Sequence, residues 1–451
     1  MAHDHPIGSP IPVVGGGLAG CEAAWQLAER GHHVVIHEMR PTVRTPAHTT
    51  DRLAELVCSN TFKSTDLSNA HGLLKAEMRR LGSLVLRAAD LARVPAGSAL
   101  AVDRELFSRM VDERIAAHPR ISIVRREEQS IPSPAVIATG PLTSDRLASA
   151  LTQRLGLDAL AFYDAIAPIV AHDSIDEDRV FLGSRYGRET MEGSDSGAYL
   201  NCPMTREQYE SFVDALLTAE CYPGHDFDTV SYFEGCLPIE EMAVRGRDTM
   251  RFGPLKPVGL PNPATGRLAY AVLQLRREDR AGRMWNLVGC QTRMRTAEQQ
   301  RVFRLIPGLE NAEFLRYGSI HRNSYINAPA TLAPALTLRD DNLVFLAGQI
   351  TGVEGYTESS ATGLIAGINL ARALDDLPPV LPPATTMIGA LYRYLREADP
   401  AHFQPMNANF GLMEDLPEQV RDKRRKRELL AERALAELDG WIAGHALAGV
   451  A

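Results

Sequence analysis

IPVVGGGLAGCEAAWQLAERGHHVVIHEMR, residues 11–40, decides the fold. It contains a short apolar stretch, a glycine-rich turn, an amphipathic stretch that ends at Gly31, and a second apolar stretch. This order predicts a strand–helix–strand unit, and Gly31 stands where the C-terminus of a helix favours a residue that tolerates a positive φ. Pro12 has no N–H to donate, so we expect it at or before the first residue of the strand.

The glycine-rich turn GGGLAG, residues 15–20, fits the pattern G-x-G-x-x-G in the strand-to-helix context that this pattern requires. Gly15 allows a tight turn, Gly17 lets the backbone approach a pyrophosphate, and Gly20 permits close packing of the helix on the strand. The helix N-terminus adds N–H groups and a positive dipole. These features predict a dinucleotide site, whereas the alternative is a plain glycine turn in an unliganded α/β protein.

An acidic residue, Glu38, follows Gly20 by 18 residues at the expected end of the second strand. A carboxylate at this place accepts hydrogen bonds from a ribose diol. The predicted cofactor-binding residues at this end of the chain are Gly15, Gly16, Gly17, Leu18, Ala19, Gly20 and Glu38.

A second glycine-rich segment, LAGQITGVEGYTESSATG at residues 346–363, also lies between an apolar stretch and a helix of small residues. An extended FAD needs a further helix N-terminus near the electron-rich edge of its ring. A plain helix packed on a sheet would explain Ala361, Gly363 and Gly367 but not the glycines around residues 348–355. We therefore predict FAD rather than NAD as the bound cofactor, with Gly348 and Gly355 in its site.

Composition and charge limit the class of protein. The chain has 451 residues, 45% of them apolar and 23% charged, and no apolar run approaches the 18 or so residues that cross a bilayer. The first residues show no secretion signal, so a cytoplasmic location is expected. The six cysteines are scattered and form no CxxC, and only Cys221 and His225 lie close together, so we expect no metal site.

The remaining patterns suggest an insertion. A helical pattern covers about residues 66–117, and apolar strands are expected at 121–126 and 134–138. Between about 155 and 330 the runs VSYFEGCLPIEE (230–241) and LAYAVLQLRR (268–277), with turns at 262–266 and 279–283, favour a strand-rich domain. A proline-rich linker precedes a helical end, where Leu430, Ala434 and Leu438 recur at four-residue spacing before Gly440.

The predicted fold class is α/β. It comprises a Rossmann-like FAD-binding domain of the glutathione-reductase type, an inserted mixed α/β substrate domain and a helical C-terminal tail. The expected boundaries are 1–155 and 331–376 for the two parts of the FAD-binding domain, 156–330 for the inserted domain, and 377–451 for the linker and basic tail.

The chain resembles the folate-dependent, flavin-containing tRNA (uracil-5-)-methyltransferases, the TrmFO family, over nearly its whole length. The segments that carry the resemblance occur in order: GGGLAGCEAAWQLAERG, EMRP, PAHTTDRLAELVCSN, GLLKAEMRRLGSL, RVPAGSALAVDRE, ATGPLTS, YLNCPMT, FGPLKPVGL, LQLRREDRAGRMWNLVG, HRNSYINAP and AGQITGVEGYTES. The related GidA (MnmG) proteins, which modify the tRNA wobble uridine, share the glycine motifs at both ends. They are usually longer and lack the EMRP and VCSN segments.

The resemblance implies methylation of the T-loop uridine of tRNA to ribothymidine. In this family 5,10-methylenetetrahydrofolate supplies the carbon, reduced FAD supplies the hydride, and NAD(P)H reduces the flavin. The implied partners are tRNA and folate, with no obligate protein partner and no membrane. The alternatives are a tRNA wobble-uridine-modifying flavoprotein of the GidA type, a flavin oxidoreductase that acts on a small molecule, and a tRNA-binding protein that keeps the nucleotide fold without turnover.

Two cysteines become candidates for catalysis. C5 of uracil is not nucleophilic until a group adds to C6, and a thiolate is suited to that reversible addition. Cys236, in FEGC, matches the C6 nucleophile proposed for the family. Cys58, in VCSN, matches its second functional cysteine, which would assist proton removal from C5 or shield the flavin-methylene species. Without the resemblance, a lone cysteine such as Cys58 is more often a packing residue, as expected for Cys21, Cys202, Cys221 and Cys290.

Two residues are candidates for the folate site. The resemblance suggests His321 as the imidazole that stacks on the pterin, the alternative being a hydrogen-bonded histidine in a turn. Trp285 could line the folate pocket, although a tryptophan that begins a strand is more often part of the core.

A basic run, RDKRRKRELL at residues 421–430, has six basic residues and one acidic residue in its first seven positions. Such clustering favours binding to phosphates through counterion release, while the alternative is a solvated helix face. This local excess of positive charge is unusual in a chain whose net charge is −8. The predicted tRNA-binding residues are Arg421, Lys423, Arg424, Arg425, Lys426 and Arg427.

Overall fold

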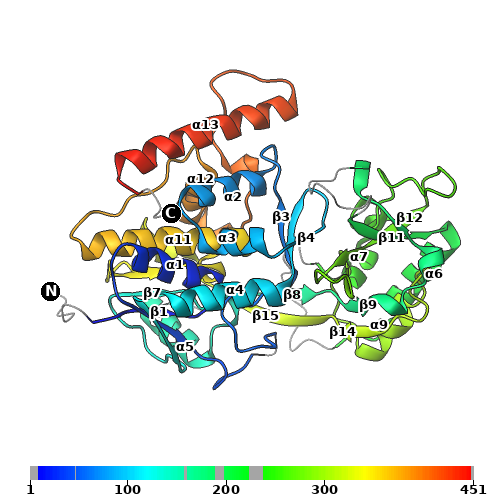
Figure 1. Ribbon diagram of the computed structural model, residues 1–451, viewed down its shortest axis with the longest axis horizontal. Helices are drawn as coiled ribbons and strands as arrows, with labels where there is room; N and C mark the ends of the chain where they lie inside the picture. The colour runs from blue at the N-terminus through cyan, green and yellow to red at the C-terminus, as the bar shows by residue number, and fades with distance from the viewer. Residues whose placement is uncertain (1–8, 46, 157–159, 188–197, 223–236, 448–451) are drawn as a thin grey trace.

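Two large hydrophobic cores of the described residues lie side by side along the long axis of the protein (Figure 1), and a small third cluster contains Val94, Ala96 and Ala101. The computed structural model describes residues 9–45, 47–156, 160–187, 198–222 and 237–447. One core draws on residues 11–155 and 325–447, and we call this part the nucleotide unit. The other core draws on residues 170–314, and we call this part the inserted unit.

A five-stranded parallel sheet forms the centre of the nucleotide unit. Its order is β16 (Val344–Leu346), β7 (Ala135–Ile137), β1 (Ile11–Val14), β2 (Val34–Glu38) and β6 (Ile121–Arg125). One face carries α1 (Leu18–Glu29), α4 (Arg104–Ala117) and α11 (Tyr356–Leu374), and α5 (Asp145–Leu155) lies on the other (Figure 1). Because all strands are parallel, their carboxyl ends meet at one edge of the sheet, where ligands bind in such folds. This architecture, with the inserted unit and the helical tail, confirms the predicted fold class.

Pro12 is the second residue of β1, so its expected place at or before the start of the strand is wrong. The N–H of Ile11 donates to His33 O, on the β2 side of the strand. Backbone groups alternate along a strand, so the nitrogen of Pro12 faces β7. Pairing with β7 begins only at Val13, and therefore the sheet loses no ladder hydrogen bond.

Helices α1 and α11 pack with almost no space between their backbones. A Cβ atom on Gly363 would lie 2.1 Å from Ala19 O, and one on Gly367 would lie 2.6 Å from Ala23 O. The small residues of α11 were expected to fit a helix packed on a sheet, but these two glycines face another helix. The contact joins the first and last parts of the nucleotide unit.

The inserted unit contains a six-stranded antiparallel sheet. Its order is β10 (Phe181–Leu182), β11 (Tyr199–Met204), β12 (Ala271–Arg277), β13 (Met284–Leu287), β9 (Ile169–Ala171) and β14 (Phe314–Arg316). The accompanying helices are α6 (Arg206–Leu217), α7 (Ile239–Arg245), α8 (Thr249–Phe252) and α9 (Thr296–Phe303). Strand β12 and the turns at Gly266 and Gly282 match the sequence prediction.

The predicted strand at residues 230–241 is wrong at its C-terminal end, where residues 239–241 begin α7. Pro238 directly precedes this helix, and Glu240 and Glu241 lie in its first turn. Both features favour a helix start, because proline has no N–H to lose there and acidic groups interact well with the helix dipole. The remainder of that run, residues 230–236, lies outside the described residues.

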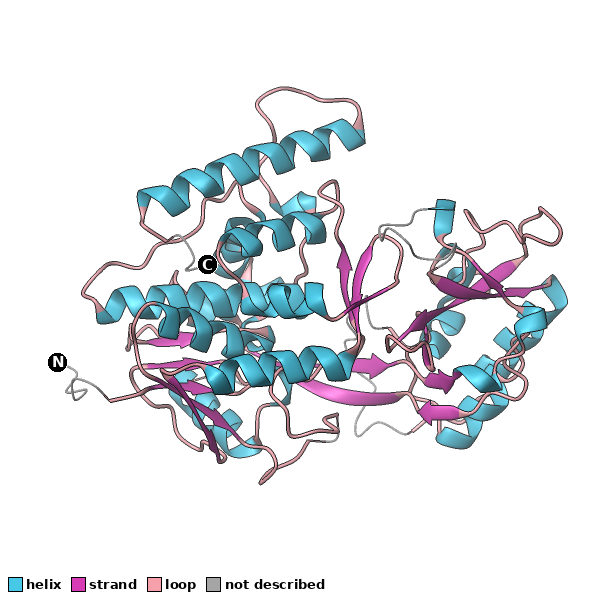
Figure 2. Ribbon diagram, in the orientation of Figure 1, coloured by secondary structure: helices cyan, strands magenta, loops and turns pink. Residues whose placement is uncertain are grey.

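Two long strands connect the units (Figure 2). β8 (Leu160–Ile166) leaves the nucleotide unit, β15 (Ser319–Tyr325) returns to it, and the two pair antiparallel. A small sheet of β3 (Thr61–Ser64), β5 (Ala99–Val102) and β4 (Arg93–Val94) lies beside α2 (Ala70–Arg80) and α3 (Leu84–Leu91). The helical prediction for 66–117 missed β4 and β5, which are too short to show a strand periodicity.

The C-terminal segment packs onto the nucleotide unit through α12 (Met387–Glu397) and α13 (Lys423–Gly444), and α12 contacts the short helix α10 (Ala328–Thr331), which precedes β16. Glu77 of α2 holds the start of α12, because its carboxyl group accepts the N–H groups of Met387 and Ile388 at 2.7 and 2.8 Å. Burial raises the pKa of Glu77 to about 8. In α13, Leu430, Ala434 and Leu438 are buried as their spacing indicates, and the helix runs past Gly440. No helix among the described residues is long and apolar enough to cross a membrane.

Candidate active site

The glycine loop between β1 and α1 has the geometry of a phosphate cradle. Gly15 has φ +99°, and a Cβ there would lie 2.7 Å from Ala138 O. A Cβ on Gly20 would lie 1.9 Å from Gly15 O, so Gly20 packs against the loop itself. A Cβ on Gly17 would meet nothing within 4 Å, and no side chain caps the first N–H groups of α1. An anionic group therefore has room at this helix N-terminus.

Glu38 lies at the carboxyl end of β2, beside the glycine loop. Its Oε2 accepts the N–H of Gly16 at 2.9 Å, and its Oε1 accepts the backbone N–H and Nε–H of Arg40 at 3.0 and 2.9 Å. Burial opposes ionisation of this carboxyl group, but the hydrogen bonds and charge of Arg40 outweigh it and lower the pKa of Glu38. Glu38 is therefore a fixed carboxylate, with lone pairs left for further donors.

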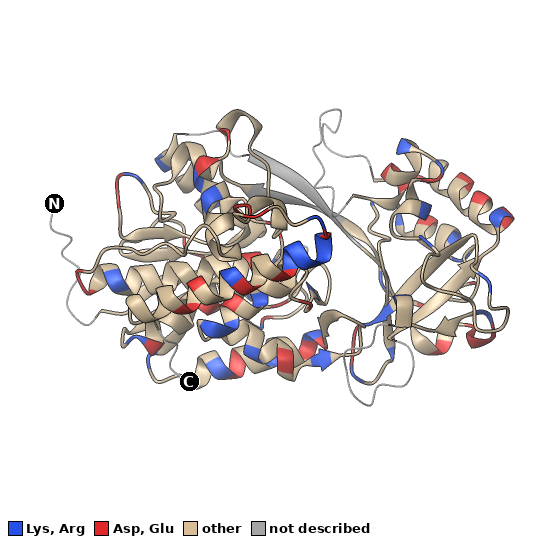
Figure 3. Cartoon of the chain, turned by 90° about the horizontal axis from the view of Figure 1, so that it is seen from above, with Lys and Arg blue, Asp and Glu red and all other residues tan. Residues whose placement is uncertain are grey.

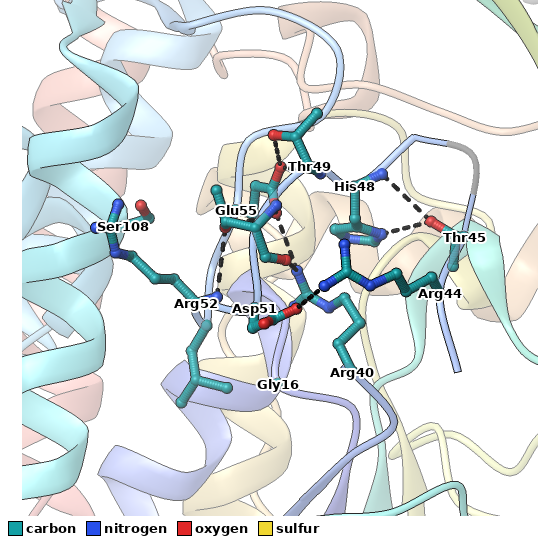
Figure 4. A network of polar contacts seen from close by, with 12 residues as sticks. Gly16, Arg40, Arg44, Thr45, His48, Thr49, Asp51, Arg52, Glu55 and Ser108 are labelled. Atoms are coloured by element: carbon teal, nitrogen blue, oxygen red, sulfur yellow. Dashed lines mark hydrogen bonds and ion pairs between the residues drawn. The ribbon is translucent and has the colours of Figure 1, made fainter. Parts of the chain in front are cut away.

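Arg40 joins Glu38 to the loop that follows it. Figure 4 shows Arg40 beside Glu55 of this loop. Its side chain is 2% exposed, and its Nη1 donates to Glu55 Oε2 at 3.1 Å and to Thr50 O at 3.1 Å. Glu55 in turn accepts the N–H groups of Thr49 and Thr50 at 2.7 and 3.0 Å. Sequence reasoning gave Arg40 no role, although a basic residue two positions after the predicted ribose acceptor was an available signal.

The same loop lies directly against the glycine turn. Ala54 N–H donates to Gly16 O at 2.9 Å, and a Cβ on Gly16 would lie 2.4 Å from the side chain of Leu53. Residues 39–56 thus form a strap, which fixes the glycine turn from the side opposite β1. We refer to this segment as the strap.

The groove at the glycine loop adjoins a larger cavity, because one residue lines both. The groove is lined by residues 14–17, by Glu38 and by residues 138–144, and Leu142 also lines a cavity of about 460 Å³. Three parts of the chain contribute to that cavity. The part before the insertion contributes Cys58, Lys63 and His71. The inserted unit contributes Arg276, Asn286 and Gly289, and the part after it contributes Gln349, Gly355 and Tyr356. A long ligand can therefore extend from the glycine loop into the cavity.

The second glycine segment supplies a helix N-terminus to this cavity. Gly355 precedes α11 with φ +121° and makes no side-chain cap. Gly348 has φ +83°, and its N–H donates to Thr362 Oγ1 at 2.8 Å. The N-terminus of α1 thus borders the groove, and the N-terminus of α11 borders the adjoining cavity.

Cys58 lies in the cavity wall and is held by several parts of the chain. The N–H groups of Cys58 and Ser59 donate to Tyr356 Oη at 2.8 and 3.0 Å, and Arg104 Nη2 donates to Cys58 O at 3.2 Å. Burial raises the pKa of Tyr356 well above its ordinary value, so its hydroxyl group stays neutral. Arg104 also forms an ion pair with Glu278 of the inserted unit at 2.6 Å.

The other described cysteines differ from Cys58. Cys21, Cys202 and Cys290 are fully buried, and burial raises the pKa of each thiol far above its ordinary value. Cys221 is partly exposed, but burial and nearby carboxylates raise the pKa of its thiol to about 11. Cys58 alone among the described cysteines lines the cavity. Cys236 lies outside the described residues.

A charged group that the sequence prediction missed includes two residues of the cavity wall, Lys63 and His71, and the buried Glu358 behind them. Glu358 in the first turn of α11 is 1% exposed, and its carboxylate is 3.1 Å from His71 Nδ1. Burial opposes ionisation, but the positive charge of Lys63 and the contact with His71 lower the pKa of Glu358 to about 2. Lys63 and His71 both line the cavity. They lie more than 280 residues before Glu358, so no local pattern could reveal the group.

The two folate candidates lie on different strands. His321 is in β15 and pairs with Asp164 of β8, and its side chain is outside the described part. Trp285 in β13 is 1% exposed, and its Nε1–H donates to Gly282 O at 2.8 Å. It packs in the core of the inserted unit and does not line the cavity, whereas its neighbour Asn286 does. Successive side chains of a strand point to opposite faces, which explains the difference.

The basic run forms the start of α13 and a short segment before it. Figure 3 shows this basic end of α13 directed toward the inserted unit. Arg424 and Arg425 pair with Glu428, and Lys426 pairs with Asp415 at 2.6 Å. Within the described residues, Arg421, Lys423 and Arg427 make no ion pair. The run is therefore half neutralised and half available to an anionic partner. No group of three metal-binding side chains occurs in the part of the chain that the structure describes.

Known proteins share both the sequence and the fold. A family model described as glucose inhibited division protein A matches residues 10–378. A protein of Geobacter sulfurreducens named methylenetetrahydrofolate-tRNA-(uracil-5-)-methyltransferase TrmFO is 58% identical over 435 residues, which are 96% of this chain and 99% of that protein. A protein of the same name from Desulforudis audaxviator is 55% identical over 96% of this chain and 98% of its own length. Another from Pelobacter propionicus is 54% identical over 96% of this chain and 94% of its own length.

A solved structure, GidA of Aquifex aeolicus, aligns with a TM-score of 0.69 and 15% identity, covering 99% of this chain and 75% of that chain. This likeness establishes the shared fold. The family match and the relatives at 54–58% identity show that the chain belongs to the glucose inhibited division protein A family and, with it, to the methylenetetrahydrofolate-tRNA-(uracil-5-)-methyltransferases TrmFO.

Proposed function

We propose that the protein methylates C5 of the T-loop uridine of tRNA reductively, giving ribothymidine, with 5,10-methylenetetrahydrofolate as the carbon donor. The observation that carries this proposal is the position of Cys58. Cys58 lines a cavity that the N-terminus of α11 borders, and this cavity adjoins the groove at the glycine loop. The activity for which the similar proteins are named supports the same reaction.

The residues present fit FAD. The open backbone at Gly17 and the uncapped start of α1 suit a pyrophosphate, and the Glu38 carboxylate suits a ribose diol. The uncapped start of α11 at Gly355 suits the electron-rich edge of the ring. Bound FAD, once reduced by NAD(P)H, supplies the hydride that converts the transferred one-carbon group to a methyl group.

The thiols do the remaining chemistry. A thiolate that adds to C6 of uracil makes C5 nucleophilic, and the same thiolate leaves after C5 has formed its new bond and released its proton. We assign the C6 addition to Cys236 and a role at C5, in proton removal or shielding, to Cys58. The backbone of Cys58 is fixed by Tyr356 and Arg104, so its thiol is held at the cavity wall. His321 remains our candidate for stacking on the pterin.

A GidA-type modification of the wobble uridine is the second candidate, because the GidA fold is shared over almost the whole chain. Two observations favour the first candidate. Identity to the GidA structure is 15% against 58% for the TrmFO relative, and the chain spans only 75% of the GidA chain. We also propose a cytoplasmic location and the domain boundaries expected from the sequence. The two cores support the division near residues 155 and 330, whereas residues 377–447 share the core of the nucleotide unit.

The proposed reaction predicts the source of the carbon. Incubation of the FAD-loaded protein with NADPH, unmodified tRNA transcript and methylene-labelled tetrahydrofolate should place the label in ribothymidine. Replacement of Cys236 or Cys58 with alanine should lower the transfer by roughly 1000-fold or more, because residues that act as a unit in catalysis are costly to lose. Cys202→Ala, at a fully buried thiol of β11 that does not line the cavity, is the control and should keep the transfer. Label that enters only from S-adenosylmethionine would refute the proposal.

The strap makes a prediction for cofactor binding. Arg40→Met removes the group that holds Glu38 and Glu55 together, so FAD should bind roughly tenfold more weakly or worse, in line with the cost of breaking a buried charged network. The measurement is a titration of the apoprotein with FAD, followed by flavin fluorescence. Arg44→Ala is the control, because Arg44 is 61% exposed and pairs only with Asp51 on the same strap. Equal FAD affinity in the two variants would show that the strap does not position Glu38.

The basic tail should contribute to tRNA affinity, since the charges without ion pairs can release counterions on binding phosphates. Replacement of Arg421, Lys423 and Arg427 with glutamine should weaken tRNA binding and reduce the slope of log affinity against log salt by about 0.7–0.9 for each phosphate that is no longer neutralised. Arg424→Gln and Arg425→Gln, whose guanidinium groups pair within the helix, should have a smaller effect. An unchanged salt slope in the triple variant would assign the run to a solvated helix face.

A further inference from the structure

The segment FGPLKPVGL, residues 252–260, begins with the most exposed large apolar side chain that the structure describes. Phe252 ends α8 and is 82% exposed, while Leu255 three residues later is fully buried. The segment has no role in the cofactor site or in the chemistry assigned to the two thiols. Its exposed phenyl ring therefore needs a separate explanation, since large aromatic side chains usually bury most of their surface.

The backbone around Phe252 is firmly held. Leu255 N–H donates to Met250 O at 2.8 Å, and Val272 N–H of β12 donates to Leu255 O at 3.0 Å. Arg185 reaches across the segment, and its Nη1 donates to Lys256 O at 2.9 Å and to Val258 O at 2.5 Å. Phe252 is thus presented to solvent from an anchored segment.

The segment lies against the wall of the cavity that contains Cys58. Gly289 lines this cavity, and a Cβ on Gly289 would lie 2.3 Å from the ring of Pro254. Pro254 therefore packs on the outer side of the wall, two residues after Phe252. Phe252 is therefore carried by the inserted unit, two residues before this contact with the cavity wall.

The charges near Phe252 are compatible with a phosphate. Lys256 lies four residues after Phe252, and its N–H donates to Gly253 O at 3.4 Å. Its side chain is exposed and makes no ion pair with any described residue. Arg251 is already occupied, because it pairs with Asp248 at 3.0 Å and stacks on Tyr270. The available charge at this place is therefore the ammonium group of Lys256.

We propose that Phe252 stacks on a base of the tRNA loop next to the uridine that enters the cavity, while Lys256 contacts a neighbouring phosphate. This inference rests on the proposed function. A base that reacts inside the cavity must leave the stack of its loop, and its neighbours are then without a stacking partner. An exposed aromatic ring beside the cavity replaces that partner, and such stacking tolerates any base.

The test compares Phe252→Ala, Phe252→Trp and Val244→Ala in the full-length, FAD-loaded protein. Val244 is the matched control, because it is an apolar side chain in the neighbouring helix α7 and is 70% exposed. Phe252→Ala should raise the Kd and KM for unmodified tRNA transcript roughly tenfold or more, as expected when one base–aromatic stack is removed. Phe252→Trp should restore binding, and Val244→Ala should leave it unchanged. Reduction of FAD by NADPH without tRNA should be the same in all variants.

Two further readouts separate stacking from a structural role. With 2-aminopurine beside the target uridine, the wild-type protein and Phe252→Trp should quench its fluorescence on binding, and Phe252→Ala should not. Lys256→Gln should lower the slope of log tRNA affinity against log salt by about 0.7–0.9, the value for a single phosphate.

Unchanged tRNA affinity in Phe252→Ala would overturn the inference. If that variant instead changed its oligomeric state while its tRNA affinity stayed the same, Phe252 would belong to a contact between protein copies, which also overturns the inference. Failure of Phe252→Trp to rescue a weak Phe252→Ala variant would also overturn it. These results are distinct from a failure of the proposed function, which would appear in the wild-type protein as tRNA binding without transfer of the labelled carbon.

Discussion

The close approach of α1 and α11 is the constraint on which the active site depends. At Gly363 there is no room for even a Cβ atom, because it would lie 2.1 Å from the carbonyl oxygen of Ala19. This contact brings the glycine loop at the start of the chain and the glycine segment after the insertion to one edge of the sheet. Two helix N-termini, each with a partial positive charge, then border the groove and the adjoining cavity, and an anionic extended cofactor would favour that arrangement.

The inserted unit completes the site rather than standing apart from it. Asn60, two residues after Cys58, is fully buried, donates to Arg277 O at 2.8 Å and accepts the Nε–H of Arg276 at 2.8 Å. The ion pair between Arg104 and Glu278 is formed across the same boundary. The segment that carries Cys58 is thus fixed by both units. A change in their relative position would move the thiol relative to the cofactor groove.

The sequence predicted those parts of the site that local patterns specify. The order of strand, glycine turn and helix at both ends, the positive φ at Gly31 and the spacing of Leu430, Ala434 and Leu438 follow from short-range periodicity and backbone sterics. The position of Pro12 depends on where the neighbouring strand starts, and the burial of Trp285 depends on which face of β13 meets the core. Neither the position of Pro12 in its strand nor the burial of Trp285 can be predicted from one segment alone.

Contacts between distant segments were also beyond the reach of sequence patterns. Tyr356 bonds to the backbone of Cys58, and Glu358 contacts His71, but only the folded chain brings these groups together. Phe252 was visible as part of a motif, yet its exposure became evident only when Leu255 and Pro254 were seen to anchor the segment beside the cavity wall.

The central claim is that the flavin ring occupies the cavity beside Cys58 while the phosphates rest on the glycine loop. The most direct measurement is the rate of alkylation of each cysteine by a small thiol reagent, resolved by mass spectrometry, in the apoprotein and after reloading with FAD. The account predicts that FAD protects Cys58 strongly and leaves the partly exposed Cys221 of the inserted unit unchanged. Equal alkylation rates of Cys58 with and without bound FAD would contradict it.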